Sequence, residues 1–113
     1  MLEVPLISVV NQELNIILGD QNCTIAIYQK EKNTYLDLFV GDSAIRVGAL
    51  CVPKAPIILK PCNFVGQLYI VDIDSPPNAQ TLPNYKELGK RYKLFYLDKQ
   101  EEESAENGRY NRL

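Results

Sequence analysis

Apolar and polar residues alternate along residues 13–47, the pattern of strands that each bury one face. The Gly19-Asp20 and Gly41-Asp42 turns and a tight turn at Glu31-Lys32 divide this stretch into four segments. Glycine at the first loop position suits a two-residue type II′ turn, which joins antiparallel strands. The pattern therefore predicts a four-stranded antiparallel meander over Glu13–Val47.

The turns also predict which residues lie opposite each other. Counting outward from each turn places apolar residues opposite apolar residues, so one face of the meander is expected to be aliphatic. On the other face the same counting places Asp37 opposite Arg46 as a surface ion pair. The predicted apolar pairs are Leu14 with Ile25, Ile16 with Cys23, Ile27 with Leu36, Ile25 with Leu38, Cys23 with Val40, Leu38 with Ile45, and Leu36 with Val47.

An N-terminal arm and a proline-rich crossover flank the meander. Leu2–Val10 contains Pro5, which cannot donate a ladder hydrogen bond, so residues 1–12 are expected to form an arm or an edge strand. Three prolines within Val52–Pro61 predict an extended crossover. The crossover has apolar residues that need cover from the rest of the chain, namely Ile57, Ile58 and Leu59.

Two more strands and one helical turn are expected after the crossover. Gly66–Ile73 is apolar on both faces, which is typical of a central strand, and Lys90–Leu97 has the same character. Between them, Asn84 and Gly89 are suited to begin and end a single helical turn near residues 84–89. The chain is therefore expected to be all-β, with residues 13–97 forming a small antiparallel barrel or sandwich.

Residues 98–113 form a tail that begins DKQEEE and ends NGRYNRL. Composition alone favours disorder for its acidic part. Arginine and tyrosine are common at protein interfaces, so we expect the tail to lie against a partner chain. The candidate partner-binding residues of the tail are Arg109, Tyr110, Arg112 and Leu113.

Composition is that of an ordinary single-domain globular protein and excludes several classes of function. The 113 residues carry a formal charge of −2 and include no histidine. Histidine-based bases, triads and zinc-water mechanisms are excluded in their usual forms, and the charge argues against a general nucleic-acid surface. The sequence also has no phosphate-binding glycine motif, no membrane-length apolar run and no signal peptide. We therefore expect no enzyme, no cofactor and no nucleic-acid or membrane binding.

Cysteines and aspartates provide no metal site at the sequence level. Cys23, Cys51 and Cys62 do not match a zinc pattern and are expected to be reduced thiols, although the proximity of the last two stays open. Asp72 and Asp74 fail the spacing of a calcium loop and are expected to face solvent.

The second face of the predicted meander carries aromatic residues. Tyr28 and Tyr35 lie opposite each other in the predicted register, and Phe39 lies further along the second of these strands. Either the later strands cover these rings, or the rings form a protein–protein surface. A further alternative is a small ligand- or carbohydrate-binding β-module that uses Tyr28, Tyr35 and Tyr69 as stacking platforms.

Several short motifs follow one another in a set order between about residue 3 and residue 98. They are Asn11-Gln12, Gly19-Asp20, Thr24, Tyr35-Leu36-Asp37, Gly41-Asp42, Pro53, Gly66 with Leu68, and Leu88-Gly89 with Arg91-Tyr92. This ordered set resembles the phage baseplate plug family, small β-rich proteins encoded among the tail genes of contractile-tailed bacteriophages. The acidic tail departs from the family pattern.

The resemblance implies a structural, non-enzymatic virion component at the centre of the tail baseplate, present in several copies and assembled in the host cytoplasm. The partners that it implies are hub, tube-end (initiator) and spike proteins, with wedge proteins as a further candidate. We expect the chain to contact them through its N-terminal arm, its C-terminal tail and the aromatic residues Tyr28, Tyr35 and Phe39. Deleting Glu101–Leu113 is then expected to leave the isolated fold intact and to weaken incorporation into tails.

Overall fold

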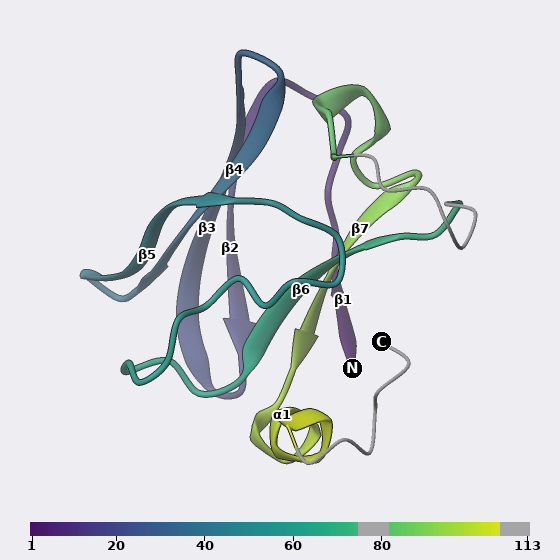
Figure 1. Ribbon diagram of the computed structural model, residues 1–113. Coiled ribbons are helices and arrows are strands. Elements are labelled where there is room, and N and C mark those ends of the chain that lie inside the picture. The colour runs from purple at the N-terminus through teal and green to yellow at the C-terminus, as the bar shows by residue number, and fades with distance from the viewer. Residues whose placement is uncertain (75–81, 107–113) are drawn as a thin grey trace.

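A computed structural model of the chain describes residues 1–74 and 82–106. Two antiparallel sheets form a β-sandwich, and a short helix lies at one end (Figure 1). The larger sheet has the strand order β2-β3-β4-β5, and the smaller sheet has the order β1-β7-β6. The all-β prediction is confirmed, and the architecture is the sandwich rather than a closed barrel. The elements are β1 (Leu2–Val4), β2 (Asn11–Leu18), β3 (Gln21–Lys30), β4 (Asn33–Val40), β5 (Ser43–Leu50), β6 (Gln67–Asp72), the 3₁₀ turn η1 (Tyr85–Glu87), β7 (Tyr92–Leu97) and α1 (Lys99–Glu106).

The predicted meander is the larger sheet, and its first two hairpins have the predicted register. Leu14 pairs with Ile25 across β2 and β3, and Ile27 pairs with Leu36 across β3 and β4. The β2–β3 turn differs in type from the prediction, because both Gly19-Asp20 residues have positive φ, at 55° and 62°. Positive φ at both loop positions is the pattern of a type I′ turn.

The third hairpin keeps the predicted register only next to its turn. Val40 pairs with Ser43, but two irregularities in the β4–β5 ladder then shift the pairing, so that Leu38 lies opposite Arg46. A bulge adds a residue to one strand and changes which side chains face the core beyond it. The predicted pairs that prove wrong are Leu38 with Ile45, Asp37 with Arg46, and Leu36 with Val47.

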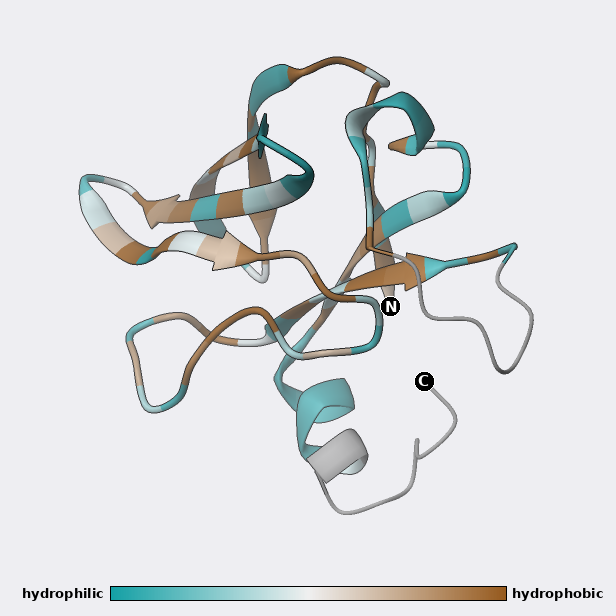
Figure 2. Ribbon diagram, turned by 45° about the horizontal axis from the view of Figure 1, so that its top comes forward, coloured by the Kyte–Doolittle hydropathy of each residue, from teal (hydrophilic) through white to brown (hydrophobic). Residues whose placement is uncertain are grey.

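The hydrophobic core lies between the two sheets. Alternate residues of β3 and β4 form one wall, where Ile25 and Leu38 are fully buried. Alternate residues of β6 and β7 form the other wall, where Ile70 and Leu94 are fully buried. Burying each such aliphatic side chain stabilises the fold by about 1.5–3 kcal/mol, so this wall-to-wall contact is what holds the sheets together. Figure 2 shows β6 in hydrophobic colours and the coloured part of α1 in hydrophilic ones.

The proline-rich crossover runs along the outer edge of β6. The backbone N–H of Ile57 donates to the carbonyl oxygen of Leu68 at 3.0 Å. Ile57 and Ile58 are buried as expected, but Leu59 is 63% exposed, so the expectation that it is covered is wrong. β6 is an edge strand of its sheet, contrary to the prediction, whereas β7 is the central strand, as its two apolar faces indicated. The crossover thus takes the place of a neighbouring strand along the outer edge of β6.

Glutamine side chains replace strand pairing at three places. Each of these amides accepts from the N–H and donates to the C=O of a single residue, as a neighbouring strand would. The pairs are Gln12 with Ile7, Gln21 with Val65, and Gln67 with Ile58. They fasten the N-terminal arm, the loop before β6 and the crossover to the sheets.

The helical turn η1 confirms the prediction made for residues 84–89. The side chain of Asn84 accepts a hydrogen bond from the backbone N–H of Lys86, and Gly89 ends the turn with a φ of 78°. In the described residues, neither η1 nor α1 has the length and apolar character needed to cross a membrane.

Helix α1 occupies the acidic stretch whose composition favoured disorder. A capping box begins it, because Glu101 N–H donates to Asp98 Oδ1 at 2.9 Å while Asp98 N–H donates to Glu101 Oε1 at 3.1 Å. This reciprocal pair satisfies two backbone donors that a helix start leaves without partners. The capping-box motif is present in the sequence as D-K-Q-E over residues 98–101.

Candidate partner-binding surfaces

The aromatic face of the larger sheet points away from the core. Side chains alternate along β3 and β4, so the buried Ile25 and Leu36 face the smaller sheet while Tyr28, Tyr35 and Phe39 face outward. All three aromatic side chains are half-buried by their neighbours within the sheet. The smaller sheet covers the aliphatic face, and the alternative in which the later strands cover the aromatic rings is not realised.

A hydrogen-bond network holds the aromatic rings in position. Tyr28 and Tyr35 stack across β3 and β4 with ring centroids 6.0 Å apart and planes inclined at 24°. The Tyr28 hydroxyl donates to Asp37 Oδ1 at 2.9 Å, and the backbone N–H of Gly48 donates to the same oxygen at 2.7 Å. Burial, and then the hydrogen bond to Asp37, raises the pKa of the Tyr28 hydroxyl. The hydroxyl therefore remains a proton donor at neutral pH.

Arg46, the predicted partner of Asp37, bonds to the crossover instead. Its Nε donates to the carbonyl oxygen of Ile57 at 3.3 Å. The shifted register of β5 brings Gly48 rather than Arg46 to the Asp37 carboxylate. Sequence reasoning missed this contact because turn counting does not reveal a bulge.

Apolar residues of the edge strands extend the aromatic face. Leu50 of β5 lies opposite Tyr35 and is 41% exposed. On the other edge strand, β2, Ile17 is 65% exposed. Exposed aliphatic residues next to aromatic rings are typical of surfaces that bind other proteins.

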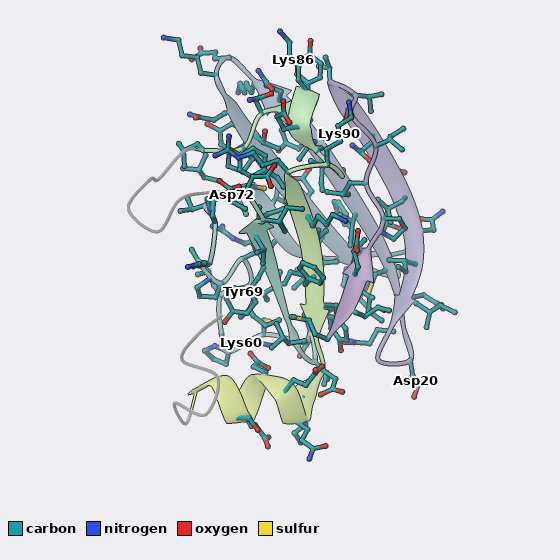
Figure 3. All side chains as sticks on the ribbon, turned by 90° about the vertical axis from the view of Figure 1, so that its right-hand side faces the viewer. Asp20, Lys60, Tyr69, Asp72, Lys86 and Lys90 are labelled. Carbon is teal, nitrogen blue, oxygen red and sulfur yellow. The ribbon has the colours of Figure 1, made fainter. Side chains whose placement is uncertain are left out.

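The three tyrosines of the ligand-binding alternative lie on two different faces. Tyr28 and Tyr35 line a shallow, open depression of about 370 Å³ on the larger sheet. Tyr69 lies on β6 in the smaller sheet, opposite Phe95 (Figure 3). Because Tyr69 alternates with the buried Leu68 and Ile70, it faces outward on the far side of the sandwich. The structure does not bring the three rings together.

The tail is described only as far as α1. The predicted contact residues Arg109, Tyr110, Arg112 and Leu113 lie outside the described residues. Helix α1 is fastened to the sandwich by two ion pairs, one between the Met1 amino group and Glu101 and one between Lys60 Nζ and Glu102 Oε2 at 3.7 Å.

Acidic and thiol groups have structural roles where the chain is described. Asp72 accepts two hydrogen bonds from Arg91, at 2.8 and 2.9 Å. Cys23 and Cys51 are buried and Cys62 is exposed, and all three are free thiols, so the pairing of Cys51 with Cys62 that the sequence left open is not formed. Burial raises the pKa of the Cys51 thiol to about 12. Among the described residues, no group of three His, Cys, Asp or Glu side chains is placed to hold a metal ion.

A small β-sandwich with one open aromatic sheet face is typical of a protein that binds other proteins. The chain belongs to the family of the cyanophage baseplate Pam3 plug gp18, whose family model matches residues 1–100. The match includes every strand and ends at the start of α1. Baseplate plugs are structural components of the phage virion and associate with other baseplate proteins. A search among curated proteins found no match.

Proposed function

We propose that this chain is the plug at the centre of a contractile-tail baseplate, where it joins hub, tube-end and spike proteins. Family membership supports a place in the baseplate. The observation that carries the proposal is the larger sheet, which buries one face in the core and presents Tyr28, Tyr35 and Phe39 on the other. The chain joins the tail during assembly in the host cytoplasm, in several copies.

The aromatic face is suited to binding because its rings are already ordered. Tyr28 and Tyr35 stack on each other, and the Tyr28 hydroxyl is held by Asp37. Rigid aromatic side chains lose little conformational entropy when they are buried, so most of the gain from burying them remains as affinity. A partner that covers these rings would also cover the exposed Leu50, which lies opposite Tyr35 at the sheet edge.

The edge strands provide a second mode of contact. β2 is an eight-residue edge strand, and its pairing with β3 continues without a shift over its whole length. An unblocked edge can accept a strand from a neighbouring protein through backbone hydrogen bonds. The opposite edge strand, β5, carries the ladder irregularities and is less suited to this pairing. We propose that β2 receives an extended segment of a baseplate neighbour.

Incorporation into tails tests the role of the aromatic face. A phage that lacks the gene for this chain is supplied with variants from a plasmid, and the amount of the chain in purified tails is measured by quantitative mass spectrometry. The double variant Tyr35→Ser/Phe39→Ser is expected to be incorporated about tenfold less, because removing buried aromatic anchors weakens an interface most. The matched control Phe95→Ser removes a half-buried ring from the outer face of the other sheet and is expected to be incorporated normally.

Circular dichroism of the purified variants separates loss of binding from loss of fold. Normal incorporation of a folded Tyr35→Ser/Phe39→Ser chain would overturn the role of the aromatic face. In the same assay, deleting residues 107–113 preserves every described element and removes Arg109, Tyr110, Arg112 and Leu113. Unchanged incorporation of that truncated chain would overturn the partner role of the tail.

A further inference from the structure

The two ends of the sandwich carry charges of opposite sign. Lys86 and Lys90 lie at the end that carries η1, whereas Asp20 lies at the end that carries α1 (Figure 3). The β3–β4 turn shares the first end with η1, and the β2–β3 turn shares the second end with α1 (Figure 1). We call these the basic end and the acidic end.

Three segments from different parts of the sequence build the basic end. The backbone N–H of Tyr85 donates to Gln29 Oε1 at 2.8 Å, which places η1 beside the β3–β4 hairpin. The Ser8 hydroxyl donates to the carbonyl oxygen of Leu88 at 2.7 Å, which places the N-terminal arm beside η1. The N-terminal arm, the hairpin and η1 therefore present their side chains on one surface.

Unpaired lysines and exposed aliphatic side chains share the basic end. Ile7 is 63% exposed and Val10 is 51% exposed. The lysines of this end are exposed, and none forms an ion pair with another described residue; they are Lys30, Lys32, Lys86 and Lys90. Glu31 and Glu87 are the carboxylates of the same turns, and Asp72 and Asp74 lie beside Arg91 at the adjoining end of β6 (Figure 3). With Arg91 included, the cations of this end outnumber the carboxylates by one, and Asp72 is neutralised by its ion pair with Arg91.

The acidic end also has exposed aliphatic side chains, and its charged side chains are mainly carboxylates. Val65 is 47% exposed and is fastened to the β2–β3 turn by both of its hydrogen bonds with Gln21, and Leu59 is 63% exposed in the same loop region. Lys60, Lys99 and the Met1 amino group also lie here, but carboxylates outnumber them among the described side chains. These carboxylates are Asp20, Asp98, Glu101, Glu102 and Glu103.

We propose that copies of this chain associate head to tail, with the basic end of one copy on the acidic end of the next. Each end has exposed aliphatic side chains with charged side chains around them. Protein interfaces likewise combine an apolar core with a polar rim. Opposite signs attract only in the head-to-tail arrangement, because a two-fold dimer through either end would oppose like charges. A head-to-tail contact repeats, so it closes into a ring or continues as a stack. The proposal does not depend on which baseplate proteins the chain meets.

Analytical sedimentation tests this association. The purified full-length chain is measured over a range of protein concentrations and of salt concentrations. We expect oligomers at low salt that dissociate as salt rises, because exposed charges are screened. Lys86→Glu/Lys90→Glu makes the basic end acidic, and Asp20→Lys/Glu103→Lys makes the acidic end basic. Each variant alone is expected to associate at least about tenfold more weakly, because like charges then meet at the contact.

Mixing the two charge-reversed variants distinguishes a head-to-tail contact from damage to the fold. The intact acidic end of the first variant and the intact basic end of the second are complementary, so the mixture is expected to recover the association of the unmodified chain. Asp20→Asn/Glu103→Gln, which suits the positive φ of Asp20, is expected to weaken association less than the charge reversal. Lys54→Glu reverses an exposed charge in the crossover, beside the middle of β6, and is expected to change nothing.

Three outcomes would overturn the proposal. The first is a chain that stays monomeric at every concentration up to about 1 mM at low salt. Its dissociation constant would then exceed about 1 mM, which is weaker than most specific contacts. The second is two variants that stay monomeric when mixed although each is folded. The third is association that survives both charge reversals and is lost in Tyr35→Ser/Phe39→Ser, which would assign self-association to the aromatic face instead.

Discussion

The buried amide of Gln67 bonds both backbone groups of Ile58 and so joins the crossover to β6. Its Oε1 accepts from Ile58 N–H at 2.7 Å and its Nε2 donates to the Ile58 carbonyl oxygen at 2.9 Å. The side chain is 4% exposed, so water cannot easily replace it. Prolines prevent a continuous ladder in this part of the chain, and one side chain supplies the missing hydrogen bonds.

Gln67→Leu is expected to lower the free energy of unfolding by about 2–4 kcal/mol, because it leaves buried backbone groups of the crossover without partners. Urea denaturation measures the loss. Gln12→Leu is the matched control, because Gln12 makes the same paired bonds to Ile7 at an exposed site where water can replace them. We expect the control to cost less than about 1 kcal/mol, and equal losses would contradict the role assigned to burial.

The candidate interface residues show which positions of single residues the sequence could predict. Turn counting predicted that Tyr28 and Tyr35 lie opposite each other, and the structure confirms this pairing. The partner of Asp37 could not be read in the same way, because the bulge in β5 brings Gly48 to its carboxylate. A partner role for the rings remains a prediction.

Among the elements, the N-terminal arm is positioned by the turn that follows η1. Ser8 bonds to the Leu88 carbonyl, and the backbone of Leu6 passes directly over Gly89. A Cβ at Gly89 would collide with the Leu6 carbonyl oxygen. Glycine is therefore needed here both for its positive φ of 78° and for this close approach.

Gly89→Ala is expected to destabilise the fold by about 3 kcal/mol, since a positive φ and a backbone clash act together. Gly48→Ala provides the control, because Gly48 has a similar φ of 70° but open space around the added Cβ. Its expected cost is only the conformational one, about 1–2 kcal/mol. Denaturant midpoints compare the two variants, and equal shifts would show that the arm does not pack on this turn.

The elements differ in how far local signals predicted them. Turns and alternation predicted the first two hairpins, and capping residues predicted η1. β5 was mispredicted because its alternation of Ile45, Val47 and Ala49 looks regular, although Ala49 is buried and Val47 is exposed. Helix α1 was missed because acidic composition outweighed the capping box at Asp98.

For the whole molecule, both sheets and the crossover contribute to a single core. Cys23 on β3 and Cys51 at the start of the crossover are both buried in it. Burial raises the pKa of each thiol, for Cys51 to about 12, so both stay protonated and unreactive at neutral pH while the fold is intact. Their reactivity therefore reports the opening of two distant parts of the core.

In the Cys62→Ser variant, Cys23 and Cys51 are expected to become reactive at the same urea concentration, because a shared core unfolds as one cooperative unit. Thiol labelling followed by peptide mass spectrometry measures the two midpoints separately. Reaction of Cys51 at clearly lower urea than Cys23 would show instead that the crossover opens on its own.

By itself, the sequence determined the all-β class, the first two hairpins, the helical turn at 84–89 and the sharing of one face by Tyr28, Tyr35 and Phe39. These features depend on turn residues, alternation and caps, which act between neighbours along the chain. Only the tertiary structure decided that the later strands leave the aromatic face uncovered, that β6 lies at an edge, that Leu59 is exposed and that β5 is shifted in register. Each of these depends on which distant segment packs against a residue, and that packing also brings the lysines of two separate segments to one end of the molecule.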